Sequence, residues 1–331
     1  MTMPSPTVTP RTTLGAYALG PSPDLDDGRA DAAFYDGLAE LTTTDGHGID
    51  ALELPLDPEG SPRLELGWLT RHLHPSWDLM VTAVPRTMKR LSTQPAYGLA
   101  SADEDARRAA VADIAVVRDL ARALADASGR VRVTAIELQS APGSTLGSRD
   151  ALARSIDEIL AWDVPGAELV IEHCDAPVDG QQPVKGFLTL ADELAVIRDL
   201  PDTVGIGINW GRSAIEGRSA ATPIEHTAAA VAAGRLRSLI FSGASDVTTP
   251  WGRPWSDAHI PAYVPGTVLD MATGSLLTAD ATTATLAAAA GQARYVGAKV
   301  TVRPTDTDVP TRLAVARASL DLVASSAAVL R

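Results

Sequence analysis

The chain of 331 residues has a single cysteine, Cys174. One cysteine cannot form an internal disulfide, and a cysteine-based zinc site is implausible because such sites use several thiolates. A chain without disulfides fits a reducing compartment.

Basic runs and long apolar runs are also missing, and the formal charge at pH 7 is -13. This acidic balance argues against binding to a phosphate backbone or to an anionic membrane surface. No apolar segment approaches the roughly 20 residues that span a bilayer. The opening MTMPSPTVTPRTT lacks the basic and apolar regions of a secretion signal. We expect a soluble, cytoplasmic protein with no nucleic-acid or membrane partner.

Short apolar runs alternate with longer amphipathic segments along the chain, which is the pattern of repeated βα units around a parallel sheet. The apolar runs predict eight strands, at residues 14–20, 49–56, 77–85, 131–139, 167–173, 204–209, 236–243 and 293–302. Apolar residues recur at helical spacing between them. They predict helices at residues 103–127, 148–163, 189–200, 222–234 and 311–330.

Eight such units favour one α/β domain, a closed (β/α)8 TIM barrel over residues 13–331. Residues 1–12 are rich in Pro, Thr and Ser and are predicted to be a flexible tail. A doubly wound open sheet is the alternative, but no predicted strand is followed by a G-x-G-x-x-G turn. The barrel is therefore the preferred fold.

Barrel enzymes carry their chemistry at the carboxyl ends of the strands. Glu137 and Glu172 interrupt apolar runs near such ends, and Lys299 interrupts the last run. A carboxylate in an apolar run is costly unless it is paired. Structural ion pairs are one explanation, but two carboxylates and a lysine at strand ends favour a catalytic site.

Other polar residues follow the same strand ends and are candidates for substrate binding: Glu53, His173, Asp175, Asn209, Arg212, Glu216, Arg218, Asp246 and Arg303. The segment 242–266 is longer than usual βα connections, which indicates a lid or a binding loop. It adds Trp255 and His259, and its tryptophans could stack on sugar rings while its polar residues bind hydroxyls. The alternative is that its tryptophans only anchor the loop to the barrel rim.

With these residues, the chain resembles the xylose isomerase-like barrels, a superfamily of sugar isomerases, sugar-phosphate isomerase/epimerases and endonuclease-type relatives. More narrowly, it resembles an uncharacterised bacterial branch with a degraded metal site. The resemblance covers about residues 13–328 and rests on strand-end patterns. It implies a xylose isomerase-like TIM barrel that acts on a carbohydrate.

Ketose epimerases of this superfamily bind a divalent metal through a Glu after strand five, an Asp after strand six, a His after strand seven and a Glu after strand eight. The corresponding positions here are Glu172, Asn209, Phe241 or Ser242, and Lys299. The Asp-x-x-His motif after strand six, with its later Glu, corresponds to NWGRSAIE. Arg212 occupies the position of the substrate-contacting His of that motif, and Glu216 occupies the position of its later Glu.

Divalent cations prefer several carboxylate or imidazole ligands, so this resemblance implies loss of the metal site. We predict no cofactor and no metal, with Glu172 as a ligand if any metal binds. A shifted divalent-metal site that uses Glu137, Glu172, His173 or Asp175 stays open.

The resulting hypothesis is a sugar isomerase or epimerase that acts on a keto or aldo sugar. Lys299 would polarise the substrate carbonyl in place of the metal, while Glu172 or Glu137 moves a proton. Arg212, Arg218 and Arg303 could recognise an acidic or phosphorylated group.

Other functions stay open. A Schiff-base aldolase or lyase would use Lys299 as the nucleophile. A non-catalytic sugar-binding barrel would use Lys299 only to neutralise Glu172. An endonuclease is disfavoured because the sequence shows neither a metal-binding cluster nor a basic groove. The expected partner is a small carbohydrate, and a homo-oligomer is also open.

Overall fold

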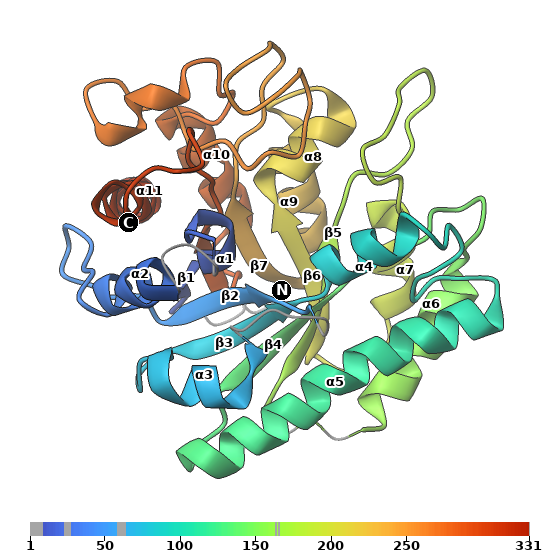
Figure 1. The fold of residues 1–331 in the computed structure, drawn as a ribbon. Helices are drawn as coiled ribbons and strands as arrows, with labels where there is room; N and C mark the ends of the chain where they lie inside the picture. The colour runs from blue at the N-terminus through green and yellow to red at the C-terminus, as the bar shows by residue number, and fades with distance from the viewer. Residues whose placement is uncertain (1–8, 23–27, 58–63, 163, 165, 331) are drawn as a thin grey trace, which may run out of the picture.

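Eight parallel strands close into a barrel in the computed structural model of the chain (Figure 1). The structure describes residues 9–330 except 23–27, 58–63, 163 and 165. Each strand pairs with its sequence neighbours, and the last strand pairs with the first. The strands are β1 (Arg11–Leu14), β2 (Ala51–Pro55), β3 (Asp78–Thr82), β4 (Val133–Leu138), β5 (Glu168–His173), β6 (Val204–Asn209), β7 (Leu236–Phe241) and β8 (Tyr295–Ala298).

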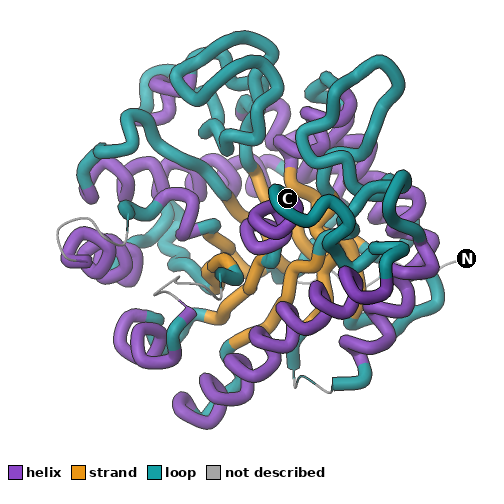
Figure 2. The backbone as a smooth tube through the Cα atoms, turned by 45° about the vertical axis from the view of Figure 1, so that its right-hand side comes forward, coloured by secondary structure: helices purple, strands orange, loops and turns teal. Residues whose placement is uncertain are grey.

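Helices surround the strands, as Figure 2 shows by the purple segments around the orange centre. They are α1 (Ala16–Leu19), α2 (Arg29–Ala39), α3 (Leu66–His72), α4 (Val84–Leu91), α5 (Glu104–Ser128), α6 (Arg149–Leu160), α7 (Leu190–Ile197), α8 (Trp210–Gly217), α9 (Thr222–Ala232), the 3-10 helix η3 (Val268–Ala272), α10 (Ala279–Ala289) and α11 (Val309–Val329). Among the described residues, no helix is both long enough and apolar enough to cross a membrane.

The predicted single (β/α)8 barrel is confirmed, and the last seven predicted strand runs each contain the observed strand. The first predicted strand was wrong in position. β1 ends at Leu14, and the apolar residues that follow it form α1, whose Ala16 and Leu19 are buried. A short apolar run cannot by itself separate a strand from a buried helical turn. The predicted tail was also too long, because Arg11 and Thr12 belong to β1; residues 1–8 of that tail lie outside the described part.

The barrel interior changes from apolar to charged toward the carboxyl ends of the strands. One buried interior cluster consists of Ala51, Met80, Ala135, Val170 and Tyr295. Residues two apart on a strand share a face, so Glu53, Glu137 and Glu172 lie above members of this cluster. Lys299 follows β8 on the same face as Tyr295. The sequence thus places a charged layer on an apolar one.

A glycine in the β1–α1 turn makes room for this lysine. A Cβ on Gly15 would lie 2.7 Å from Cγ and 2.8 Å from Cβ of Lys299. We expect Gly15→Ala to lower the free energy of unfolding by about 1–3 kcal/mol, the usual cost of overpacking, in urea titrations. The matched control is Gly48→Ala, whose Cβ would meet only the Leu41 carbonyl at 3.9 Å. Equal unfolding midpoints for the two variants would contradict this account of the turn.

Candidate active site

A buried ammonium lies inside the charged layer. Lys299 Nζ donates to Glu53 Oε1 at 2.5 Å and lies 3.6 Å from Glu172 Oε1. It also lies 5.1 Å from the ring centroid of Tyr17, on α1. Burial alone lowers the pKa of Lys299, but the carboxylates of Glu172 and Glu53 outweigh burial and raise this pKa well above its ordinary value. The amine is therefore an ammonium at neutral pH.

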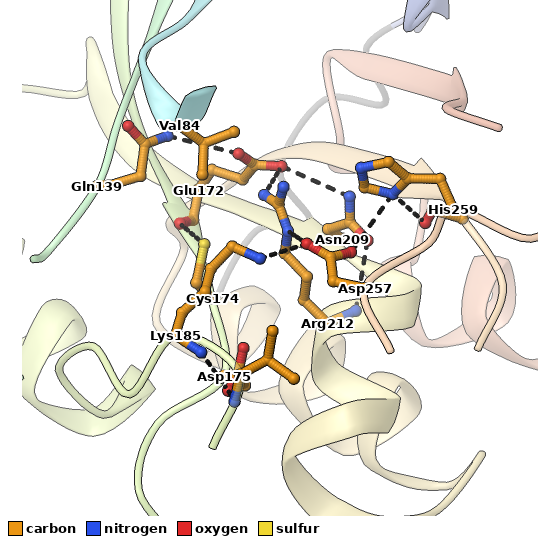
Figure 3. A network of polar contacts seen from close by, with 12 residues as sticks. Val84, Gln139, Glu172, Cys174, Asp175, Lys185, Asn209, Arg212, Asp257 and His259 are labelled. Atoms are coloured by element: carbon orange, nitrogen blue, oxygen red, sulfur yellow. Dashed lines mark hydrogen bonds and ion pairs between the residues drawn. The ribbon is translucent and has the colours of Figure 1, made fainter. Parts of the chain in front are cut away.

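Glu172, near the end of β5, is the most heavily contacted carboxylate of the layer (Figure 3). It forms an ion pair with Arg212 and accepts hydrogen bonds from Gln139 Nε2 at 3.4 Å and Asn209 Nδ2 at 3.5 Å. Burial raises the pKa of Glu172, but Arg212 and then Lys299 outweigh burial and bring it to about 2. Glu172 is therefore an ionised carboxylate.

The passage from β6 into α8 positions Arg212. Asn209 ends the strand and caps the helix, because its Oδ1 accepts a hydrogen bond from the Arg212 N–H at 3.4 Å. No loop separates the two elements, so Arg212 lies in the first turn of α8, beside the barrel mouth. Its Nε donates to Asp257 Oδ2 at 3.3 Å. One guanidinium thus contacts two carboxylates, those of Glu172 and Asp257.

Glu137, on β4, has no such partner. Both of its carboxyl oxygens are buried and without a hydrogen-bond partner among the described residues. They lie close to those of Glu53 and Glu172, since these three residues bring carboxyl oxygens within 4.8 Å of one another. Burial, followed by the charges of Glu172 and Glu53, raises the pKa of Glu137 well above its ordinary value. Its surroundings therefore favour the protonated, neutral form of Glu137.

Two long loops meet over these residues. Lys185, in the loop after β5, forms an ion pair with Asp257, in the loop after β7 (Figure 3). Asp257 Oδ1 also lies 3.5 Å from His259 Nδ1, which is 2.8 Å from Ser242 Oγ. Burial lowers the pKa of His259 to about 3 despite the opposing charge of Asp257, so the ring is neutral.

The central charges of the site are closed to solvent. Glu53, Glu137 and Lys299 are 0% exposed, Arg212 is 1% exposed and Glu172 is 2% exposed. A substrate can reach these groups only after the covering loops move.

His173 follows Glu172 on β5 and therefore points to the opposite side of the barrel wall. Its Nδ1 lies 2.8 Å from Glu193 Oε2, and its Nε2 lies 3.1 Å from Glu216 Oε2. Burial lowers the pKa of His173, but Glu193 and Glu216 outweigh burial and raise it to about 10. His173 and Glu216, both predicted to bind substrate, are thus paired with each other and do not contact Lys299.

Three further predicted binding residues, Asp175, Arg218 and Trp255, lie in segments near the site. Asp175 Oδ2 accepts hydrogen bonds from the N–H groups of Val184 at 2.6 Å and Lys185 at 2.9 Å, so it shapes the loop after β5. The Arg218 guanidinium lies 5.2 Å from the centroid of the Trp255 ring. Asp175 belongs to the loop after β5 and Trp255 to the loop after β7, the two loops that cover the barrel mouth.

Two predicted residues lie apart from the central charges. Asp246 is exposed in the loop after β7. Arg303 is half-buried and donates to the Val302 carbonyl at 2.8 Å. Trp251 of the same long loop is buried and donates to the Thr301 carbonyl at 3.3 Å, which is the anchoring role considered for a tryptophan of this loop.

Sequence reasoning brought Glu53, Glu137, Glu172, Asn209, Arg212 and Lys299 together, but it missed others. Lys185 carried no signal in the polar segment DGQQPVKG, and Asp257 was one of several polar residues in a long loop. Tyr17 fell inside a run that we predicted to be a strand. Gln139 could have been included, since it directly follows β4 at a spacing of two from Glu137 and therefore lies on the same face.

Two groups of described residues bring three potential metal ligands within 4.8 Å of one another: Glu53, Glu137 and Glu172, and His173, Glu216 and His226. In the first group, the ammonium of Lys299 contacts Glu53 and Glu172 and the guanidinium of Arg212 contacts Glu172, whereas Glu137 has no hydrogen-bond partner among the described residues. In the second, Glu193 and Glu216 occupy both ring nitrogens of His173. A divalent cation would therefore have to displace Lys299 and Arg212 from the first group and Glu193 from His173 in the second.

Comparison with known proteins gives family matches at the level of sequence. A family model described as a domain of unknown function (DUF4862) matches residues 13–315. The uncharacterized protein STM3670 of Salmonella typhimurium (strain LT2) is 37% identical over 254 residues, which cover 75% of this chain and 77% of that protein.

Solved structures match at the level of the fold. D-psicose 3-epimerase from Clostridium cellulolyticum H10, solved with D-tagatose, has a TM-score of 0.56 at 16% identity and covers 96% of this chain and 99% of its own. A xylose isomerase domain protein from Alicyclobacillus acidocaldarius has a TM-score of 0.53 at 14% identity, with the same coverage of both chains. Endonuclease IV from Thermus thermophilus has a TM-score of 0.53 at 14% identity and covers 94% of this chain and 99% of its own. The chain therefore has the xylose isomerase-like TIM-barrel fold.

The buried His173 makes stability depend on pH. Its folded pKa is raised from 6.5 to about 10, so its stabilising contribution is complete below about pH 6.5 and is lost as the pH rises through about 10. We expect the free energy of unfolding, from urea titrations, to fall across this range in the wild type. The fall should be much smaller in His173→Gln, while the exposed control His74→Gln should keep the wild-type slope. Identical slopes in all three proteins would rule out a charged His173.

Proposed function

The chain belongs to the DUF4862 family and has a xylose isomerase-like barrel, and from these premises we propose that it is a metal-independent sugar isomerase or epimerase. The observation that carries the proposal is the contrast between two neighbouring buried carboxyl groups. The pKa of Glu172 is lowered to about 2, whereas the pKa of Glu137 is raised well above its ordinary value. Two groups with pKa values pushed apart can act as a base and an acid in one reaction.

In the proposed reaction, the carbonyl oxygen of a keto or aldo sugar faces the Lys299 ammonium and the Arg212 guanidinium. The Glu172 carboxylate removes the proton from the carbon next to the carbonyl, the C–H electron pair forms the enediolate double bond, and the carbonyl oxygen becomes negative. Fixed cations stabilise that charge without rearrangement. Protonation of the same carbon by Glu137 on the other face gives the epimer. Protonation of the former carbonyl carbon, with transfer of the hydroxyl proton to the former carbonyl oxygen, gives the isomer. Exchange with solvent then removes the proton from Glu172 and returns one to Glu137.

The weak basicity of Glu172 fits this sequence of events. Its pKa is low because Arg212 and Lys299 face it. When these cations turn toward the developing oxyanion, they stabilise the carboxylate less and its pKa rises. The base thus becomes stronger at the moment when it must accept a proton.

The alternatives receive less support from the site. A Schiff base needs a neutral amine, whereas Glu172 and Glu53 raise the pKa of Lys299 well above its ordinary value. A barrel with only structural ion pairs would explain Lys299 and Glu172, but it would leave the unpartnered carboxyl of Glu137 without a purpose.

The test is solvent exchange at carbon. We expect the wild type to incorporate deuterium from D2O next to the carbonyl of one member of a keto-sugar panel: D-fructose, D-psicose, D-tagatose and D-fructuronate, followed by NMR. Glu172→Gln and Lys299→Met should each slow exchange by about 10²–10⁴-fold. Glu168→Gln is the matched control, since Glu168 lies on the same strand and pairs with Arg294 at the opposite end. Full exchange in both site variants would refute the assignment.

Two further measurements distinguish metal-independent proton transfer from a metal-dependent reaction and from a Schiff-base mechanism. Exchange should persist after EDTA treatment and should not rise with added manganese. Borohydride in the presence of substrate should leave Lys299 unmodified in mass spectrometry. An adduct on Lys299 would establish the Schiff-base lyase instead.

A further inference from the structure

One carboxylate of the site comes from a covering loop and not from the barrel. Asp257 Oδ2 accepts from Arg212 Nε at 3.3 Å and from the Lys185 ammonium, and its Oδ1 faces His259 Nδ1 at 3.5 Å. The side chains of Arg212 and Lys185 are only 1% and 4% exposed. Two buried cations from separate elements thus converge on one loop carboxylate.

The backbone around Asp257 is strained. Trp255 and His259 flank it with positive φ angles of 60° and 52°. Bulky residues rarely adopt this left-handed region, and such conformations persist where the surrounding contacts impose them. The ion pairs of Asp257 supply such contacts, together with the Trp255 N–H bond to the Ser245 carbonyl at 2.7 Å and the Thr301 N–H bond to the His259 carbonyl at 2.8 Å.

The same ion pair closes the site. Lys185 belongs to the loop after β5 and Asp257 to the loop after β7, and both loops lie over a group of charges that are at most 2% exposed. A substrate that reaches Lys299 has to separate these loops. Separation removes the counter-charge of Lys185 and one of the two counter-charges of Arg212. Buried or half-buried cations left without partners are costly, so the entering molecule has to replace the missing negative charge.

We propose that the Asp257 carboxylate occupies the subsite of a substrate carboxylate, and that a keto sugar acid displaces it on entry. This inference rests on the proposed function and names its substrate class. Arg212 offers a planar fork that suits a carboxylate, and Lys185 adds a point charge. A carboxylate with two oxygens reproduces what Asp257 presents to these groups. Both cations meet one oxygen of Asp257, Oδ2, while Oδ1 faces His259, and a phosphate would bring one terminal oxygen more than this carboxylate presents.

Calorimetric binding tests the substrate class without any need for turnover. Wild-type protein should bind D-fructuronate at least tenfold more tightly than D-fructose. Lys185→Met should reduce this preference to less than threefold, measured as the ratio of the two dissociation constants in the same variant. Lys89→Met is the matched control, since Lys89 is an exposed lysine that faces Asp57 at 3.9 Å, and it should behave as the wild type. Tighter binding of D-fructose 6-phosphate than of D-fructuronate would overturn the carboxylate assignment.

Chemical rescue tests the displacement itself. Asp257→Ala vacates the place of the carboxylate, so acetate should raise the thermal midpoint of this variant saturably, while chloride at equal ionic strength should not. The wild type should show no such response to acetate. Equal responses of wild type and variant, together with equal binding of D-fructose and D-fructuronate, would refute the subsite. Deuterium exchange into a neutral sugar could still succeed in that case, so failure here is distinguishable from failure of the isomerase proposal.

Discussion

The contact of the Lys299 ammonium with Glu53 and Glu172 is the interaction on which the rest of the site depends. A lysine that is fully buried in a barrel stays charged only if carboxylates surround it, because burial alone favours the neutral amine. Glu172 is also paired with Arg212, which shares its charge with Asp257, and Asp257 is paired with Lys185. Three cations then face four carboxyl groups: Glu53, Glu137, Glu172 and Asp257. The surplus carboxyl, Glu137, has no hydrogen-bond partner among the described residues, and burial beside Glu172 and Glu53 favours its protonated form. The acid of the proposed reaction is thus a consequence of charge balance around the lysine.

The apolar runs predicted the fold well, because the spacing and the length of these runs suffice to count the strands in a chain of repeated βα units. They also located Glu53, Glu137, Glu172 and Lys299, since a charge inside an apolar run stands out. The alternation rule could have separated His173 from Glu172, because neighbours on a strand point to opposite faces. Lys185 and Asp257 could not be predicted in this way. They lie in loops without periodicity, one after β5 and the other after β7. Their pairing depends on how these two loops fold over the barrel. Whether the predicted residues bind substrate stays a prediction.

Two monovalent side-chain cations are not equivalent to one divalent ion. The guanidinium and the ammonium have fixed directions, and each is tied to a carboxylate when no substrate is present. A metal ion would keep its carboxylate ligands while it polarises a carbonyl. Lys299 and Arg212 instead have to divide their hydrogen bonds between Glu172 and the substrate oxygen. The basicity of Glu172 therefore depends on the charge that develops on the substrate oxygen. A carboxylate that stays bound to a metal ion depends less on that charge.

This coupling explains why the loops belong to the chemistry and not only to access. Arg212 contacts Glu172 through one end of its guanidinium and Asp257 through Nε, so movement of the loop after β7 changes the number of carboxylates that share its charge. With Asp257 withdrawn, Arg212 would hold Glu172 more strongly and keep it a weak base. A negative group on the substrate that takes the place of Asp257 would restore the balance. Proton transfer by Glu172 would then proceed only when the covering loops and the substrate are both in position.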